Sequence, residues 1–75
     1  MENFETLEVI YDDGTNIVSW VGDEMPERDE KFEYVFARLK GDGWVLDSTE
    51  SRNVELPDGT SHLVHYATLK RPRKG

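Results

Sequence analysis

The sequence predicts an α+β fold: one small ββαββ domain over residues 1–75, with a four-stranded antiparallel or mixed sheet and one amphipathic helix on one face. Three observations predict it: a turn-forming Asp13-Gly14 pair between two β-rich runs, an apolar stripe of helical period after Pro26, and the turn LPDGT between two longer runs. A chain this short buries roughly 60% of its unfolded surface. It also lacks cysteine for a disulfide or a zinc site, so we expect a modest core.

Residues 5–11 and 15–21 are expected to form a hairpin. Asp13-Gly14 is a favoured two-residue loop, and such a loop pairs Val9 with Val18. Because side chains alternate along a strand, one face of the pair then points to the core. This face consists of Leu7, Val9, Val18 and Trp20. The opposite face mixes polar residues with Ile10, Ile17 and Val21.

Residues 26–40 are expected to form the helix. Its apolar stripe has the spacing i, i+3, i+4 and i+7 and consists of Phe32, Val35, Phe36 and Leu39. Pro26 suits the first helical position, and Gly41 suits a left-handed residue after the last turn. Acidic residues at the start and basic residues at the end also favour the helix dipole.

Residues 43–55 and 60–71 are expected to form a long hairpin around Leu56–Thr60. Pairing Leu56 with Thr60 brings Leu46 opposite Lys70, whereas a shift of one residue brings it opposite Leu69. We prefer the second register, because it collects the apolar residues on one face, and it requires a bulge within Ser48–Val54. In that register His65 lies roughly opposite Glu50. The shared core is then predicted to contain Trp20, Phe32, Phe36, Trp44 and Leu46.

The string KGDGWVLDS (Lys40–Ser48) has three interpretations. A phosphate-binding loop precedes a helix, but here the helix comes first. A calcium loop needs alternating oxygen ligands, but this string turns apolar at Trp44. We therefore interpret it as a helix cap and a short turn, after which Trp44 enters a strand beneath the helix.

Part of the chain resembles a family of small bacterial and phage proteins known as a domain of unknown function. The family reads Leu-x-x-Leu-Gly-x-x-Gly-Trp-Glu-Leu, followed by a β-arm that ends in an aromatic stretch and Lys-Arg. The matching residues, within 32–72, are Leu39, Gly41, Gly43, Trp44, Leu46, Tyr66 and Lys70-Arg71-Pro72. Val45 stands where Glu is usual, Gly41 is displaced by one place, and the arm is longer around Leu56–Thr60. The resemblance implies a small α+β fold and no established activity.

The residues do not indicate an enzyme. His62 and His65 are separated by three positions on a strand, so their side chains point to opposite faces and cannot share a metal. The aspartates are explained by turns and the helix entrance, and the serines lack the sharp turn that presents a nucleophile. We therefore expect no catalytic residue, no metal site and no cofactor.

The charge is strongly acidic and unevenly distributed. The formal net charge is −7, and residues 1–30 carry ten carboxylates against Arg28 alone. Such a surface disfavours binding to phosphate backbones. A small nucleic-acid-associated or regulatory protein stays as the alternative, because a basic tail at residues 70–75 could contact phosphate. The contact residues would be Arg52, Lys70, Arg71, Arg73 and Lys74.

The remaining candidate is an interaction surface. One helix covers only one face of a four-stranded sheet, so the opposite face must be solvated or bound. Its apolar residues are predicted to be Ile10, Ile17, Val21, Val45, Val64 and Tyr66. We expect a non-enzymatic module that binds a second copy of itself, as a weak homodimer, or an unidentified protein. The acidic start, MENFETLE, and the short apolar runs predict a cytoplasmic protein without a membrane segment.

Overall fold

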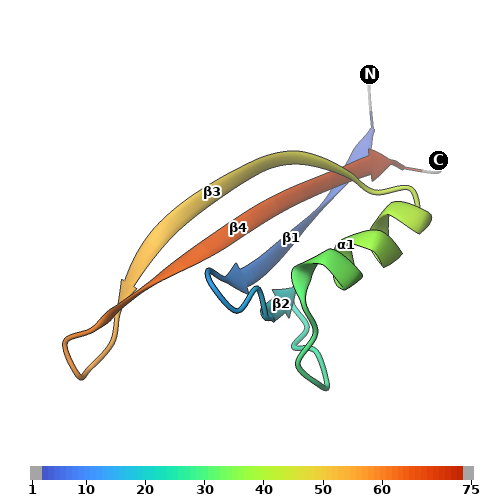
Figure 1. The fold of residues 1–75 in the computed structure, drawn as a ribbon. Helices are drawn as coiled ribbons and strands as arrows, with labels where there is room; N and C mark the ends of the chain where they lie inside the picture. Colours follow the sequence, from blue (N-terminus) through green and yellow to red (C-terminus); the bar gives the residue numbers. More distant parts are fainter. Residues whose placement is uncertain (1–2, 74–75) are drawn as a thin grey trace.

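A computed structural model describes residues 3–73 of the chain. It contains β1 (Phe4–Asp12), β2 (Val18–Val21), α1 (Phe32–Gly41), β3 (Val45–Glu55) and β4 (Ser61–Pro72). The strands form one antiparallel sheet in the order β2-β1-β4-β3. Figure 1 shows α1 on one face of this sheet and the β3–β4 hairpin as a long curved arm. The predicted α+β fold with ββαββ order is confirmed. We call the sheet face toward α1 the inner face and the opposite one the outer face.

The first turn is longer than predicted. Asp12 N donates to Ile17 O at 3.0 Å and Asn16 N donates to Asp12 O at 2.9 Å, so the loop is Asp13–Asn16 and not Asp13-Gly14 alone. Thr15 Oγ1 also donates to Asp12 Oδ2 at 3.0 Å. Asn16 adopts a positive φ of 60°, which asparagine tolerates better than most residues. These local bonds favour the longer loop over the two-residue turn.

The longer loop and an irregularity within the strand pair together change the pairing of β2. Val9 lies opposite Val21, Ile10 opposite Trp20 and Tyr11 opposite Val18, with an irregularity between Ile10 and Tyr11. The prediction that Leu7, Val9 and Val18 face the core is correct. The predicted faces of Trp20 and Val21 are wrong. Trp20 points to the outer face and is 39% exposed, whereas Val21 packs against the buried core.

The helix starts six residues later than predicted. Val18 N donates to Glu30 O and Phe32 N donates to Asn16 O, both at 2.8 Å, so the backbone before the helix pairs beside β2. Lys31 is extended, with φ −78° and ψ 146°. Pro26 is therefore a loop residue and not the first residue of the helix. The predicted stripe is correct, since Val35 is buried and Phe32, Phe36 and Leu39 pack against the core.

The helix ends in a Schellman motif. Trp44 N donates to Leu39 O and Gly43 N donates to Lys40 O, both at 3.0 Å. This pattern places the left-handed residue at Gly43, which has a φ of 94°, and leaves Gly41 as the last helical residue. The interpretation of KGDGWVLDS as a cap leading into a strand is confirmed, but the prediction that Gly41 is the left-handed residue is wrong.

The register of the arm is as preferred, with Leu46 opposite Leu69. Leu56 N donates to Thr60 O at 2.8 Å and closes the turn. The irregularity lies between Leu46 and Ser48, just before the predicted range Ser48–Val54. Because the shift occurs earlier, His65 lies opposite Ser51 and not Glu50.

The core is formed by α1, Trp44 and the inner face of three strands. Its buried residues are Val9, Val18, Val35, Trp44, Ala67 and Leu69. The prediction that Trp20 and Leu46 share the core is wrong. Trp20 lies on the outer face, and Leu46 is 45% exposed. Every residue of β3 is exposed, because this strand lies at the edge of the sheet beyond the helix.

Candidate functional site

A row of large side chains crosses the outer face of the sheet. Ile10 on β1 lies opposite both Trp20 on β2 and Tyr66 on β4, and Tyr66 lies opposite Glu50 on β3. The guanidinium of Arg52 stands 5.0 Å from the centre of the Tyr66 ring. Trp, Tyr and Arg are the residue types that contribute most to protein interfaces. We call Trp20, Ile10, Tyr66 and Arg52 the outer row.

A second apolar position lies at the other end of the outer face. Phe4 is 40% and Val45 is 51% exposed. Both lie close to Lys70, because Val45 is its cross-strand partner and Lys70 Nζ is 5.4 Å from the centre of the Phe4 ring. The polar residues Thr6, Glu8, Ser48 and Thr68 separate this position from the outer row.

The structure brings together part of the predicted interface. By strand register Ile10, Val45, Val64 and Tyr66 share the outer face. Ile17 precedes β2 and pairs with Lys31, and Val21 is on the inner face, so the prediction for Val21 is wrong. Sequence reasoning missed Trp20 and Phe4. A loop two residues longer would still have paired Trp20 with Val9, and only the irregularity between Ile10 and Tyr11 moves Trp20 to the outer face.

The predicted basic contact residues do not form one patch in the described part of the chain. Arg71 pairs with Glu5, lies 4.5 Å from the Trp44 ring and donates to Asp42 O at 3.1 Å. Lys70 pairs with Asp47 at 3.2 Å.

Arg52 pairs with Glu50 at 3.2 Å, and this carboxylate raises the pKa of Arg52. Arg52 lies opposite Val64, six residues along β4 from Lys70, which corresponds to about 20 Å. Arg73 is exposed after the end of β4, and Lys74 lies outside the described residues. The positive charges are therefore distributed along the sheet, several of them beside carboxylates.

The two histidines each contact an aspartate of the β1–β2 loop region. His65 Nε2 is 2.8 Å from Asp13 Oδ1, and its Nδ1 is 2.7 Å from Ser51 Oγ. His62 Nδ1 is 3.1 Å from Asp12 Oδ1. As predicted, the two rings are on opposite faces of the sheet, because the two residues are three positions apart on β4. His65 lies opposite Ser51 and Tyr11 on the inner face, and its ring is 5.0 Å from the Tyr11 ring.

Ser51, His65 and Asp13 are joined in series by hydrogen bonds and are the residue types of a nucleophilic triad. Ser51 lies in the middle of an extended strand, however, and is the direct cross-strand neighbour of His65. A hydrogen bond between such neighbours is an ordinary stabilising contact of a sheet. We interpret the chain of bonds as a clamp that holds the first loop against the arm. Within residues 3–73, no group of three or more His, Asp or Glu residues could hold a metal ion.

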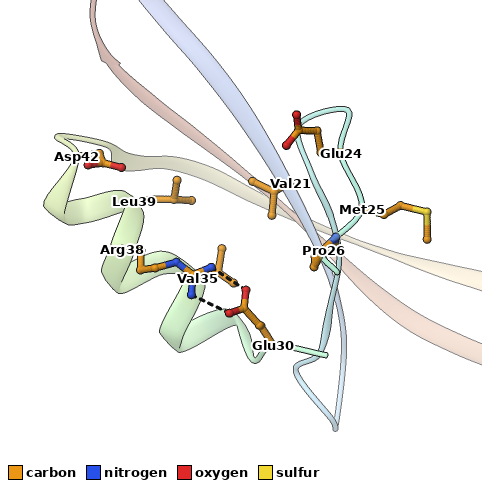
Figure 2. Close-up of a pocket in the computed structure, with 9 residues that line it drawn as sticks. All are labelled: Val21, Glu24, Met25, Pro26, Glu30, Val35, Arg38, Leu39 and Asp42. Atoms are coloured by element: carbon orange, nitrogen blue, oxygen red, sulfur yellow. Dashed lines mark hydrogen bonds and ion pairs between the residues drawn. The ribbon is translucent and has the colours of Figure 1, made fainter. Parts of the chain in front are cut away.

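A small hollow lies between α1 and the loop before it (Figure 2). Its volume is about 310 Å³, at the small end for ligand pockets. Val21, Met25, Pro26, Val35 and Leu39 supply the apolar lining, and Glu24, Glu30, Arg38 and Asp42 supply the polar part. The sequence did not predict this hollow, because its shape depends on where the loop returns to the helix.

The polar edge of this hollow contains a two-pronged ion pair. Arg38 donates to the two carboxylate oxygens of Glu30 at 2.8 and 2.7 Å, as Figure 2 shows. The hydrogen bonds from Arg38 hold the pKa of Glu30 below its ordinary value. The pair joins the loop to the helix, which is its clearest structural role.

Comparisons with known proteins identify no relative of this chain. Among residues 3–73, none of the helical structure is long and apolar enough to span a bilayer. The resemblance of residues 32–72 to a family of unknown function stays a prediction. Comparison of the chain with protein-family models, curated proteins and solved structures finds no match.

Proposed function

We propose that this chain is a non-enzymatic protein-interaction module of the cytoplasm, with the outer face of its sheet as the contact surface. The observation that supports the proposal best is the outer row, in which Trp20, Ile10 and Tyr66 lie side by side on three strands. A partner that covers this row would bury two aromatic rings and displace water from apolar surface.

A second copy of the chain is the simplest partner. The net charge of −7 opposes association, and exposed ion pairs contribute only about 0–1 kcal/mol each. Buried apolar area must therefore provide most of the binding free energy. The area is small, so the expected homodimer is weak.

Sedimentation velocity over a concentration series tests this proposal. We expect the wild-type chain to associate weakly through the outer face and Trp20→Lys to lose this association, because the variant replaces an aromatic ring of the outer row with a charge. Tyr34→Lys is the matched control, since Tyr34 is 63% exposed on the helix, on the other side of the sheet. A monomer at every concentration, or equal losses in both variants, would contradict the proposal.

The nucleic-acid alternative has less support from the geometry. Lys70, Arg71 and Arg52 each lie beside a carboxylate, which offsets the positive charge that phosphate would require. No separate observation favours it as a second function.

A further inference from the structure

β3 offers a long backbone edge. It spans Val45–Glu55, lies last in the strand order, and is exposed along its whole length. Within residues 3–73 the sheet has no strand beyond it. β2, at the other edge, is four residues long and is flanked by the loop that pairs with Ile17 and Val21. An exposed edge strand has backbone N–H and C=O groups that can pair with another strand.

The charges on β3 follow a self-complementary pattern. Glu50 and Arg52 both point to the outer face and form an ion pair at 3.2 Å, with 63% and 59% of their side chains exposed. Ser51 lies between them. If a second β3 runs antiparallel with Ser51 opposite Ser51, Glu50 of each copy lies opposite Arg52 of the other. Opposite charges at directly paired positions stabilise a sheet.

We propose that β3 pairs antiparallel with β3 of a second copy over Ser48–Val54, around a two-fold axis that passes between the two Ser51 residues. In this register Ser48 lies opposite Val54, and Thr49 lies opposite Asn53. The contact surface is the edge of the sheet and not its outer face, so the inference goes beyond the proposed function.

The charges select this register over its neighbours. A shift of two residues one way places Glu50 opposite Glu50, and a shift the other way places Arg52 opposite Arg52, which is destabilising. A shift of one residue reverses one sheet, so that the two helices lie on opposite sides. Charged residues commonly prevent edge strands from pairing. Here the charges of Glu50 and Arg52 disfavour pairing with other strands and in other registers, but they do not disfavour the register with Ser51 opposite Ser51.

The ends of the paired segment are set by the irregularity between Leu46 and Ser48. Such a bulge bends the strand and interrupts the ladder. If pairing continued past it, Asp47 would meet Glu55 of the other copy, and these like charges would repel. The bulge and the repulsion both end the pairing at Ser48.

The paired copies would form one continuous sheet of eight strands, four from each. Because the two-fold axis is perpendicular to the sheet, both helices lie on the same side. Both outer rows then lie on the other side and stay accessible. The edge contact and the outer-face contact can therefore be tested separately.

Single cysteines test the register directly, since the natural sequence has none. Opposed residues in an antiparallel pair have Cα atoms about 4.5–5.5 Å apart, within the range of a disulfide. We expect Ser51→Cys to give a covalent dimer under mild oxidation. Thr49→Cys, the control on the same strand and face, should not, because two Thr49 residues would lie about 14 Å apart.

A mixture of Thr49→Cys and Asn53→Cys chains extends the test. These two positions are opposed in the proposed register, so we expect the mixed covalent dimer and little of either homodimer. The mixture also leaves the hydrogen bond between Ser51 and His65 intact, so it decides the question if Ser51→Cys does not fold. Equal cross-linking at positions 49 and 51, or no cross-linking in the mixture, would overturn the proposal.

Charge exchange provides an independent test. Glu50→Arg should weaken dimerisation through the edge by about tenfold or more, because it places Arg opposite Arg. The double variant Glu50→Arg/Arg52→Glu should restore it. Glu33→Arg on the helix makes the same change in net charge and should not reproduce the loss. Trp20→Lys should leave the cysteine cross-links unchanged, so a failure of the outer-face proposal is distinguishable from a failure of this one.

Discussion

Individual residues explain how the irregular segment before the helix is held. Residues 22–31 contain five carboxylates and form no helix or strand. Arg38 reaches from the helix to both oxygens of Glu30, while the backbone of Glu30 accepts from Val18. The Arg38 side chain thus joins the segment to α1, and the bond from Val18 is one of the backbone bonds that join it to β2.

The Glu30–Arg38 pair gives a prediction about pH. The pKa of Glu30 lies below its ordinary value because of Arg38. The pair therefore contributes stability above the ordinary pKa, and this contribution is lost as the pH falls through the lowered value. We expect Arg38→Gln to raise the pKa of Glu30, measured by NMR titration of the carboxyl carbon.

Asp58 is an internal control for that titration. Its pKa is also below the ordinary value, but the cause is hydrogen bonding from Thr60, far along the chain in the turn of the arm. Arg38→Gln should leave this pKa unchanged. If both carboxyls shift equally, the effect on Glu30 would be a general change in the fold and not the loss of one ion pair.

At the scale of elements, β4 carries much of the stability. It is the central strand between β1 and β3, and Leu69 and Ala67 on its inner face are fully buried. Leu69 contributes its whole side chain to the core. Leu63 lies on the same face of the same strand, in the arm, and is 37% exposed.

These two leucines form a matched pair for a stability measurement. We expect Leu69→Ala to lower the free energy of unfolding by about 2–5 kcal/mol, because it leaves a cavity in a small core. Leu63→Ala should cost less than about 1.5 kcal/mol, since much of that side chain is already hydrated. Urea unfolding followed by tryptophan fluorescence measures both. Equal losses would show that the arm is packed as tightly as the core.

The whole molecule consists of a compact part and a projecting arm. Its longest dimension is 48 Å, against 26 and 18 Å for the others. β1 pairs with β4 over Val64–Pro72, and the rest of the β3–β4 hairpin extends beyond β1 (Figure 1). A two-stranded ribbon without a packed face has little independent stability.

This division predicts a gradient of amide hydrogen exchange. We expect residues 53–63 to exchange much faster than residues 64–71, because local opening of the ribbon does not disturb the core. Hydrogen exchange followed by NMR at low protein concentration measures it residue by residue. Uniform protection along β4 would contradict the division.

The sequence by itself determined the features that depend on local pattern. The spacing of Phe32, Val35, Phe36 and Leu39 predicted the helix stripe, and the apolar residues of the arm predicted the pairing of Leu46 with Leu69. Both are correct because the period of side chains along a helix or strand is a property of the backbone. The ββαββ order follows from the same patterns.

Only the tertiary structure decided which side chains reach the surface sites. An irregularity between Ile10 and Tyr11 exchanged the faces of Trp20 and Val21, and an early bulge moved His65 from Glu50 to Ser51. The strand order placed β3 at the edge and brought Asp13 beside His65. Strand order and register depend on contacts between distant residues, and a change of one residue reverses a face. No local pattern in a single sequence contains that information, so the outer row and the β3 edge became visible only in the folded chain.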